Sequence, residues 1–256
     1  MRVFITGSAD GLGQLSARQL ITDGHEVVLH ARSEARGRDA LAGAPGAAGV
    51  LVADLGSIAE TRRLAEDANG SGRFDGVIHN AGVYALPRRV QTDDGLSLVF
   101  AVNVLAPYLL TALMTRPDRL VYLTSGLHRS GDPDAFHDLQ WRDRRWSGMH
   151  AYSESKLLDV ALAFAVARRW PEVVANAVEP GWVPTKMGGP GAPDDLELGA
   201  DTQAWLAVSD DPEALISGRV LHHRRPRDAH PAAGSTDVQD ELLAACHSLT
   251  DVELGD

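Results

Sequence analysis

The chain has 256 residues, of which 44% are hydrophobic and 23% charged, and its formal net charge is -11. This composition is ordinary for a folded domain and argues against disorder. The negative charge would repel phosphate backbones, which argues against a general nucleic-acid binder. With a single cysteine, Cys246, no internal disulfide can form. We expect a cytoplasmic protein, because no signal peptide pattern precedes the first strand and no apolar run is long enough for a membrane span.

Short apolar runs alternate with helical stretches from the first residue onward. The predicted strands are Arg2–Thr6, Glu26–His30, Val50–Ala53, Phe74–His79, Arg119–Thr124, Val173–Glu179 and Ser217–Leu221. The predicted helices are Leu12–Asp23, Ser33–Leu41, Ser57 to about Asn69, a long one opened by Thr92, Asp93 and Asp94, Ala151–Trp170 and Val238–Leu249. Strands joined through helices pair in parallel with right-handed crossovers. We therefore expect an α/β fold, in which residues 1–256 form a single doubly wound Rossmann-type domain with a parallel sheet of about seven strands.

Two stretches have no regular pattern, Leu127–His150 and Trp182–Leu198. Each follows the end of a predicted strand. Ligands bind at these ends in doubly wound sheets, so both stretches are candidate pocket walls.

A glycine-rich segment, Thr6-Gly7-Ser8-Ala9-Asp10-Gly11-Leu12-Gly13, joins the first strand to the first helix. Gly7 would allow a tight turn, Gly11 would let the backbone approach a pyrophosphate, and Gly13 would let the helix pack on the sheet. Free N–H groups at the helix N-terminus would then meet the phosphates. A plain turn is the alternative, but the place of the segment favours a dinucleotide site.

This glycine spacing resembles that of the short-chain dehydrogenase/reductase family, and further family motifs follow in order along the whole chain. They are His79-Asn80-Ala81-Gly82, Asn103, Ser125, Tyr152-Ser153-Glu154-Ser155-Lys156, and Pro180-Gly181 with Thr185. The resemblance implies hydride transfer between a nicotinamide cofactor and a carbonyl or secondary alcohol. It implies the catalytic residues Asn103, Ser125, Tyr152 and Lys156. The implied cofactor-binding residues are Gly7, Ser8, Asp10, Gly11, Leu12, Gly13, Arg32, Asp54, Leu55, Asn80, Ala81, Gly82, Tyr152, Lys156, Pro180, Gly181, Val183 and Thr185.

Tyr152 and Lys156 lie at positions i and i+4 and would share one helix face. A free tyrosine has a pKa near 10, and a nearby ammonium favours the phenolate. A lowering of the pKa by about three units would correspond to roughly 4 kcal/mol. The tyrosine could then give a proton to a carbonyl oxygen or take one from an alcohol. Ser125 would donate a hydrogen bond to the same oxygen.

Asn103 is followed four residues later by Pro107. Because proline has no N–H, the backbone carbonyl of Asn103 loses its helical partner and the helix should kink there. In the family this asparagine is thought to hold a water that links the lysine to solvent. A bend that serves packing alone is the alternative.

The residues at the end of the second strand favour either NADP(H) or NAD(H), and here they are Leu29-His30-Ala31-Arg32. No carboxylate is present to hold a ribose diol, and Arg32 could meet a 2′-phosphate with its planar fork. We expect NADP(H), with NAD(H) still possible because Asp10 stands where NADP-dependent relatives often carry a basic residue. Asp54 resembles the acid that contacts the adenine amino group in the family.

The gap from Ser125 to Tyr152 is 27 positions, about twice the usual family gap. The long gap resembles the branch with retinol-dehydrogenase-like and protochlorophyllide-reductase-like enzymes, which tend to take bulky apolar substrates. Trp141, Trp146, Trp182 and Met187 either line such a pocket or anchor loops in the core. His79 and Glu179 also replace the residues that are usual in the family.

Other readings of the chain stay open. A non-catalytic NAD(P)-sensing regulator would usually lack the tyrosine or the lysine, and a sugar epimerase or dehydratase would have a different glycine spacing.

The run His222–Arg227 is either an anion site or a solvated loop or subunit contact. No cluster has metal-ligand spacing, so no metal is expected. The apolar helices Ser97–Leu113 and Ala151–Trp170 need cover on more than one face, which predicts a homodimer or homotetramer.

Overall fold

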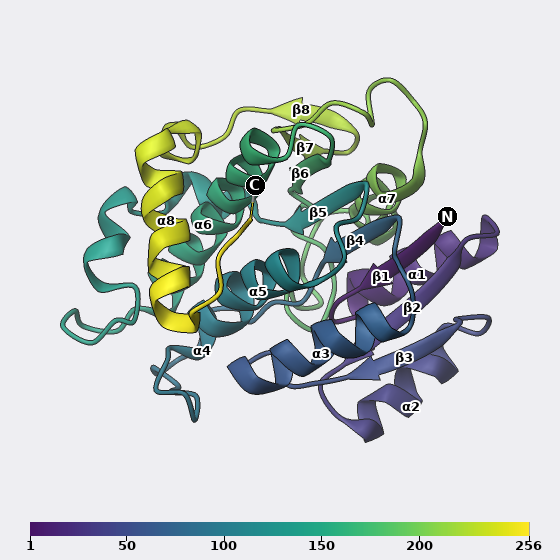
Figure 1. Ribbon diagram of the computed structural model, residues 1–256, viewed down its shortest axis with the longest axis horizontal. Coiled ribbons are helices and arrows are strands. Elements are labelled where there is room, and N and C mark those ends of the chain that lie inside the picture. Colours follow the sequence, from purple (N-terminus) through teal and green to yellow (C-terminus); the bar gives the residue numbers. More distant parts are fainter. Residues whose placement is uncertain (256) are drawn as a thin grey trace.

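The computed structural model describes residues 1–255 and is built on one eight-stranded sheet in the order β3-β2-β1-β4-β5-β6-β7-β8 (Figure 1). The strands are β1 Arg2–Ile5, β2 Glu26–Ala31, β3 Gly49–Val52, β4 Gly76–His79, β5 Arg119–Leu123, β6 Val174–Val178, β7 Val220–His222 and β8 Arg225–Arg227. Neighbouring strands are parallel except β7 and β8, which are antiparallel. The predicted doubly wound α/β domain is confirmed.

Helices cover both faces of the sheet, so its central strands are buried on both sides. On one face lie α1 Gly11–Thr22, α2 Glu34–Gly43 and α7 Leu196–Val208, and on the other lie α3 Ile58–Gly70, α5 Ala106–Leu113, α6 Gly148–Arg169 and α8 Thr236–Thr250. Side chains of β1 alternate between the two layers: Phe4 packs with the α3, α5 and α6 side, and Val3 and Ile5 with the α1 and α7 side. Short 3₁₀ segments complete the chain, η2 Gly126–Ser130, η3 Pro133–Asp138 and η4 Pro231–Gly234.

Two elements were absent from the sequence prediction. Helix α7 begins where we expected a pocket wall to continue, because Asp195 caps it by accepting hydrogen bonds from the N–H groups of Glu197 and Leu198, both at 2.9 Å. Strand β8 is only three residues long and reads Arg-Pro-Arg, which has no strand pattern. It forms an exposed sheet edge on which proline and arginine discourage pairing with another chain.

The long helix predicted to open at Thr92 was placed too early. Thr92 to Leu96 forms a turn, closed by the N–H of Thr92 donating to the carbonyl of Leu96, and helix α4 starts only at Leu98, covering Leu98–Phe100. The carboxylate of Asp94 instead accepts a 2.8 Å hydrogen bond from the N–H of Ile58, in the first turn of α3. Asp94 thus serves the N-terminus of a different helix.

The apolar helices α5 and α6 receive their cover from the same chain. Helix α8 lies along α6 (Figure 1), and the C-terminal segment crosses over α5 and the end of α6. The Tyr108 hydroxyl donates to the carbonyl of Val252, and the Trp170 indole donates to the carbonyl of Gly255, both at 2.6 Å. The cover that we expected from a second subunit is therefore supplied within one chain. Across residues 1–255, none of the helices is long and apolar enough to cross a membrane.

Candidate active site

Tyr152 lies in the first turns of α6 and is 5% exposed. Ser147 caps this helix by accepting a hydrogen bond from the N–H of His150, which fixes where the helix starts. Burial raises the pKa of Tyr152, while the Lys156 ammonium and a hydrogen bond with Ser125 lower it, and the net direction is upward. The predicted lowering of this pKa is therefore wrong for this structure, since desolvation of the phenolate outweighs the lysine.

Lys156 is buried one helical turn further along α6 and its ammonium is 5.8 Å from the centre of the Tyr152 ring. The ammonium donates to the carbonyl of Leu123 and to a carboxylate oxygen of Asp159, both at 2.7 Å. Burial would lower the pKa of Lys156, but Asp159 and Tyr152 raise it above its usual value. Asp159 was not among the predicted site residues.

Asn103 sits in a π-helical turn, η1 Ala101–Leu105, between α4 and α5. The N–H of Ala106 donates to the carbonyl of Ala101, five residues back, so the predicted disruption of the helix takes the form of a π turn. The Asn103 side chain accepts from the N–H of Val83 at 2.7 Å, and donates to the Val83 carbonyl at 3.0 Å and to the Ser155 hydroxyl at 2.9 Å. These bonds tie the segment after β4 to α6.

The glycine loop after β1 is closed against the end of β4. Gly7 has φ +62, and a Cβ there would lie 2.8 Å from the Cα of Ala81. The amide of Asn80 donates to the carbonyls of Thr6 and Gly7 at 3.0 and 2.9 Å. A Cβ on Gly13 would come within 2.4 Å of that same amide. Gly7 thus has the positive φ that suits the predicted tight turn, and Gly13 lies too close to Asn80 and to the carbonyl of Gly7 to carry a side chain.

Hydrogen bonds of the Ser8 and His30 side chains fix the glycine loop in place. The Ser8 hydroxyl is buried, donates to the carbonyl of Ile5 and accepts from the N–H of His30, both at 2.9 Å. The His30 ring accepts from the N–H of Gly7 at 3.0 Å through Nδ1, and Nε2 lies 3.0 Å from the carbonyl of Ala53. This pattern requires a neutral ring with its proton on Nε2, and burial lowers the pKa of His30 to about 4. Ser8 thus shapes the loop with its side chain turned inward.

Asp10 precedes α1, but its side chain does not cap that helix. Its carboxylate instead pairs with Arg36 at 2.6 Å and with Lys186 at 2.7 Å. The Asp10 side chain therefore leaves the N–H groups of the first turn of α1 uncapped, and such groups at a helix N-terminus suit an anion. Arg32 is exposed immediately after β2 and next to Ser33, the N-cap of α2.

The remaining predicted cofactor residues surround this loop at the carboxyl ends of the strands. A Cβ on Gly11 would lie 3.6 Å from the methyl of Thr185, so the segment after β6 lies next to the glycine loop. A Cβ on Gly82 would lie 3.6 Å from the Asn103 oxygen and 3.7 Å from the Lys156 nitrogen. These distances show that the segments after β4 and β6 lie beside Lys156 and the glycine loop, respectively.

Five other residues predicted to contact the cofactor lie after β3 and β6 and differ in their exposure. Asp54 is exposed at the end of β3, with one oxygen accepting from the N–H of Gly56 at 2.8 Å. Leu55 and Val183 are buried. Gly181 has φ +90 beside Pro180, with the Asp194 carboxylate where a side chain would start.

The comparisons with known proteins agree with this geometry. The family model for short chain dehydrogenases matches residues 1–119. The chain is 45% identical over 257 residues to the uncharacterized oxidoreductase AN7799 of Emericella nidulans, covering 98% of each chain. The chain belongs to the short-chain dehydrogenase/reductase family. It is also 30% identical to human retinol dehydrogenase 13, covering 98% of this chain and 85% of the relative, which supports the predicted retinol-dehydrogenase-like branch.

Among solved structures, this short-chain dehydrogenase/reductase resembles a crystal structure from Mycobacterium paratuberculosis with a TM-score of 0.86 at 29% identity. The match covers 100% of this chain and 95% of the other. The fold, including the segments after β7, is thus shared over the full length.

The two departures from the family motifs, His79 and Glu179, each have local partners in the structure. His79 is buried and stacks on Tyr122 with ring centres 4.8 Å apart, while its Nε2 lies 3.2 Å from the Thr111 hydroxyl. Glu179 forms two hydrogen bonds with Arg129, at 3.0 and 3.1 Å. Both replacements therefore join local polar contacts and leave Tyr152 and Ser125 unchanged.

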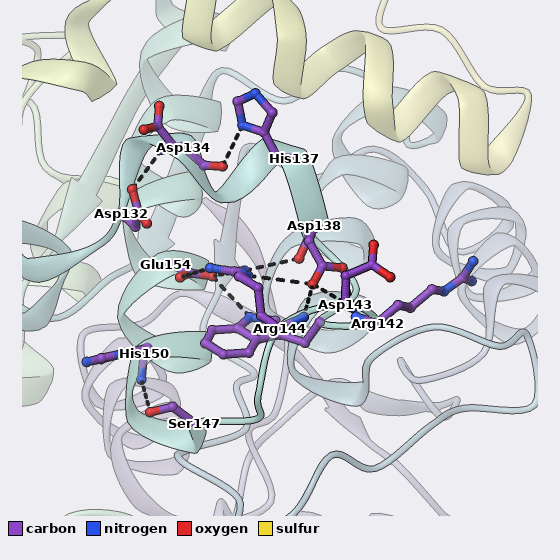
Figure 2. A network of polar contacts seen from close by, with 11 residues as sticks. Asp132, Asp134, His137, Asp138, Arg142, Asp143, Arg144, Ser147, His150 and Glu154 are labelled. Carbon is purple, nitrogen blue, oxygen red and sulfur yellow. Dashed lines mark hydrogen bonds and ion pairs between the residues drawn. The ribbon is translucent and has the colours of Figure 1, made fainter.

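The long segment between Ser125 and Tyr152 is folded against α6 by a charged and aromatic network (Figure 2). Arg144 donates to both carboxylate oxygens of Glu154 at 2.8 and 3.0 Å, and the Trp141 indole donates to the same carboxylate at 3.1 Å. The Arg144 guanidinium also lies over the Trp141 ring, 3.9 Å from its centre. The Asp138 carboxylate organises the preceding turn by accepting from backbone N–H groups.

The tryptophans and methionine that we considered as pocket residues divide into two groups. Trp141 is buried, and Trp146 meets it edge-on and donates to the carbonyl of Leu86 at 2.9 Å, so both anchor the long segment. Trp182 and Met187 are exposed, at 59% and 42%. Within the described residues no group of three or more metal-ligating side chains is assembled.

Proposed function

We propose that the chain is an NADP(H)-dependent oxidoreductase that interconverts a carbonyl and a secondary alcohol, with Tyr152 as the general acid and base. The observation that carries this proposal is the convergence of Tyr152, Ser125 and Lys156 beside Gly82, at the same end of the sheet as the glycine loop. When bound, the nicotinamide would supply or accept the hydride.

The side chains have distinct tasks in this scheme. Tyr152 would give its proton to the carbonyl oxygen during reduction and take it back from the alcohol during oxidation. Ser125 would stabilise the negative charge that develops on the same oxygen by donating a hydrogen bond. Lys156 would stabilise the phenolate that Tyr152 becomes after giving up its proton. Asn103 holds the segment with Val83 against α6, which keeps these groups in register.

The charges around the glycine loop support NADP(H) as the cofactor. Strand β2 ends in His30-Ala31 without a carboxylate, and the next residue, Arg32, is exposed. Asp10 argued against a 2′-phosphate in the sequence, but its charge is met by Arg36 and Lys186. Arg36 also pairs with Asp39, so Arg32 is the cation that we propose to meet the 2′-phosphate.

Apolar side chains beside Tyr152 support a bulky apolar substrate. The Tyr84 ring meets the Tyr152 ring edge-on, with centres 4.8 Å apart, and is 37% exposed. Its hydroxyl lies 4.0 Å from the sulfur of Met149, which is 42% exposed. A relative named retinol dehydrogenase is consistent with a substrate of this kind.

A panel of aromatic and aliphatic carbonyls with NADPH, and of the matching alcohols with NADP⁺, tests the proposal through nicotinamide absorbance. We expect turnover with bulky apolar members of the panel. Tight NADPH binding with no turnover on any member would instead favour the alternative, an NAD(P)-sensing regulator on the same fold.

A further inference from the structure

A carboxylate is buried behind the site and the mechanism above does not use it. Asp159 lies one turn after Lys156 on α6, and the side chains of the two residues are 3% and 6% exposed. One carboxylate oxygen accepts from the lysine at 2.7 Å. The other, Oδ1, is buried with no hydrogen-bond partner among the described residues.

The lysine is turned toward this carboxylate. Two of its three N–H groups donate to Asp159 and to the carbonyl of Leu123, which leaves the third N–H group for another partner. A paired ammonium attracts a nearby phenolate less than a lone ammonium does, because the carboxylate opposes it.

The other titratable groups around Asp159 are uncharged at neutral pH. Tyr122 on β5 is within electrostatic range of Asp159, and burial raises its pKa further. His79 on β4 stacks on Tyr122, and burial lowers the pKa of His79 to about 3. Tyr152 on α6 has a raised pKa as well. Lys156 is therefore the charged group that Asp159 meets.

We propose that Asp159 is a positioning residue which, as the counter-ion of Lys156, keeps Tyr152 protonated and so suits the site to carbonyl reduction. This rests on the proposed function. In reduction the carbonyl carbon receives the hydride, the C=O π bond breaks, and its oxygen takes the Tyr152 proton. Only a protonated tyrosine can start that step, whereas alcohol oxidation starts from the phenolate.

Asp159→Asn tests the counter-ion, because its amide oxygen can still accept from Lys156 while the charge is gone. We expect the alkaline limb of the pH profile for carbonyl reduction to move about one to two pH units lower. The tyrosinate titration, followed by near-ultraviolet absorbance with Tyr152→Phe subtracted, should move equally. Asp159→Glu should keep the native profile, and Asp240→Asn, at an exposed ion pair on α8, should not move it.

An Asp159→Asn protein that melts normally but keeps both midpoints within about 0.3 pH units of native would overturn the proposal, as would a shift to higher pH. If that variant does not fold, the titration of Tyr152 in the native protein tests the proposal instead. Burial and the Asp159 carboxylate both raise the pKa of Tyr152, so it should titrate at or above the usual value near 10, and a midpoint below about 8 contradicts the counter-ion role. A tyrosinate shift without turnover on any carbonyl would reject the proposed function and leave the role of Asp159 in place.

Discussion

At the scale of single residues, the cofactor assignment depends on a few charges around the glycine loop. Arg32 directly precedes Ser33, the N-cap of α2, and Arg36 in the first turn of α2 pairs with Asp10. A charge-assisted hydrogen bond to phosphate is worth about 1.5–3 kcal/mol, or roughly one to two decades of affinity. NADPH should therefore bind at least about tenfold tighter than NADH, and Ala31→Asp with Arg32→Ala should reverse the order. Fluorescence titration of both cofactors measures this, and tighter NADH binding by the native protein would reject NADP(H).

His30 makes the stability of the domain depend on pH. Its pKa is lowered by burial from 6.5 to about 4, so the folded state binds this proton less tightly than the unfolded state. The stabilisation is fully present above pH 6.5 and is lost as pH falls toward 4, at a rate of up to about 1.4 kcal/mol per pH unit. Urea unfolding between pH 7 and 4 should show this loss. His30→Asn should reduce the slope, and an unchanged slope would assign the loss to other groups.

At the scale of elements, the long segment after Ser125 is bound to α6 through the buried carboxylate of Glu154. Glu154→Gln weakens three hydrogen bonds from Arg144 and Trp141 and should lower the free energy of unfolding by about 1.5–3 kcal/mol. The matched control is Glu172→Gln, whose exposed carboxylate pairs with Arg116, and its loss should be much smaller because solvent screens that pair. Equal losses in urea unfolding would show that the segment is not fastened there.

The sequence predicted the elements well where local signals were strong and poorly where distant partners decide. Glycine spacing and the Tyr152/Lys156 pair led to the site because their geometry is local. Helix α7 was missed because it is buried on several sides and carries no helical periodicity. Asp94 looked like a cap for its own helix, but it caps α3, 36 residues away. The ion pair between Asp10 and Lys186 could not be predicted from the sequence either, because the two residues are far apart in the chain and only the fold brings them together.

At the scale of the whole molecule, the chain covers its own apolar helices. The sequence predicted a homodimer or homotetramer from the apolar faces of α5 and α6, but α8 and the C-terminal segment occupy those faces. We therefore now expect light scattering at micromolar concentration to give the monomer mass of 27.4 kDa. A mass of twice that value would support the dimer and require an interface on another face.

The central claim is that Tyr152 transfers the proton in an NADPH-dependent reduction. Tyr152→Phe removes only the hydroxyl, so it tests this claim most directly. We predict that the variant binds NADPH within about threefold of the native protein and reduces the best carbonyl of the panel at less than about a hundredth of the native rate, since a positioned general acid contributes roughly 10²–10⁴-fold. A variant that folds normally and keeps more than about a tenth of the native rate would contradict the account.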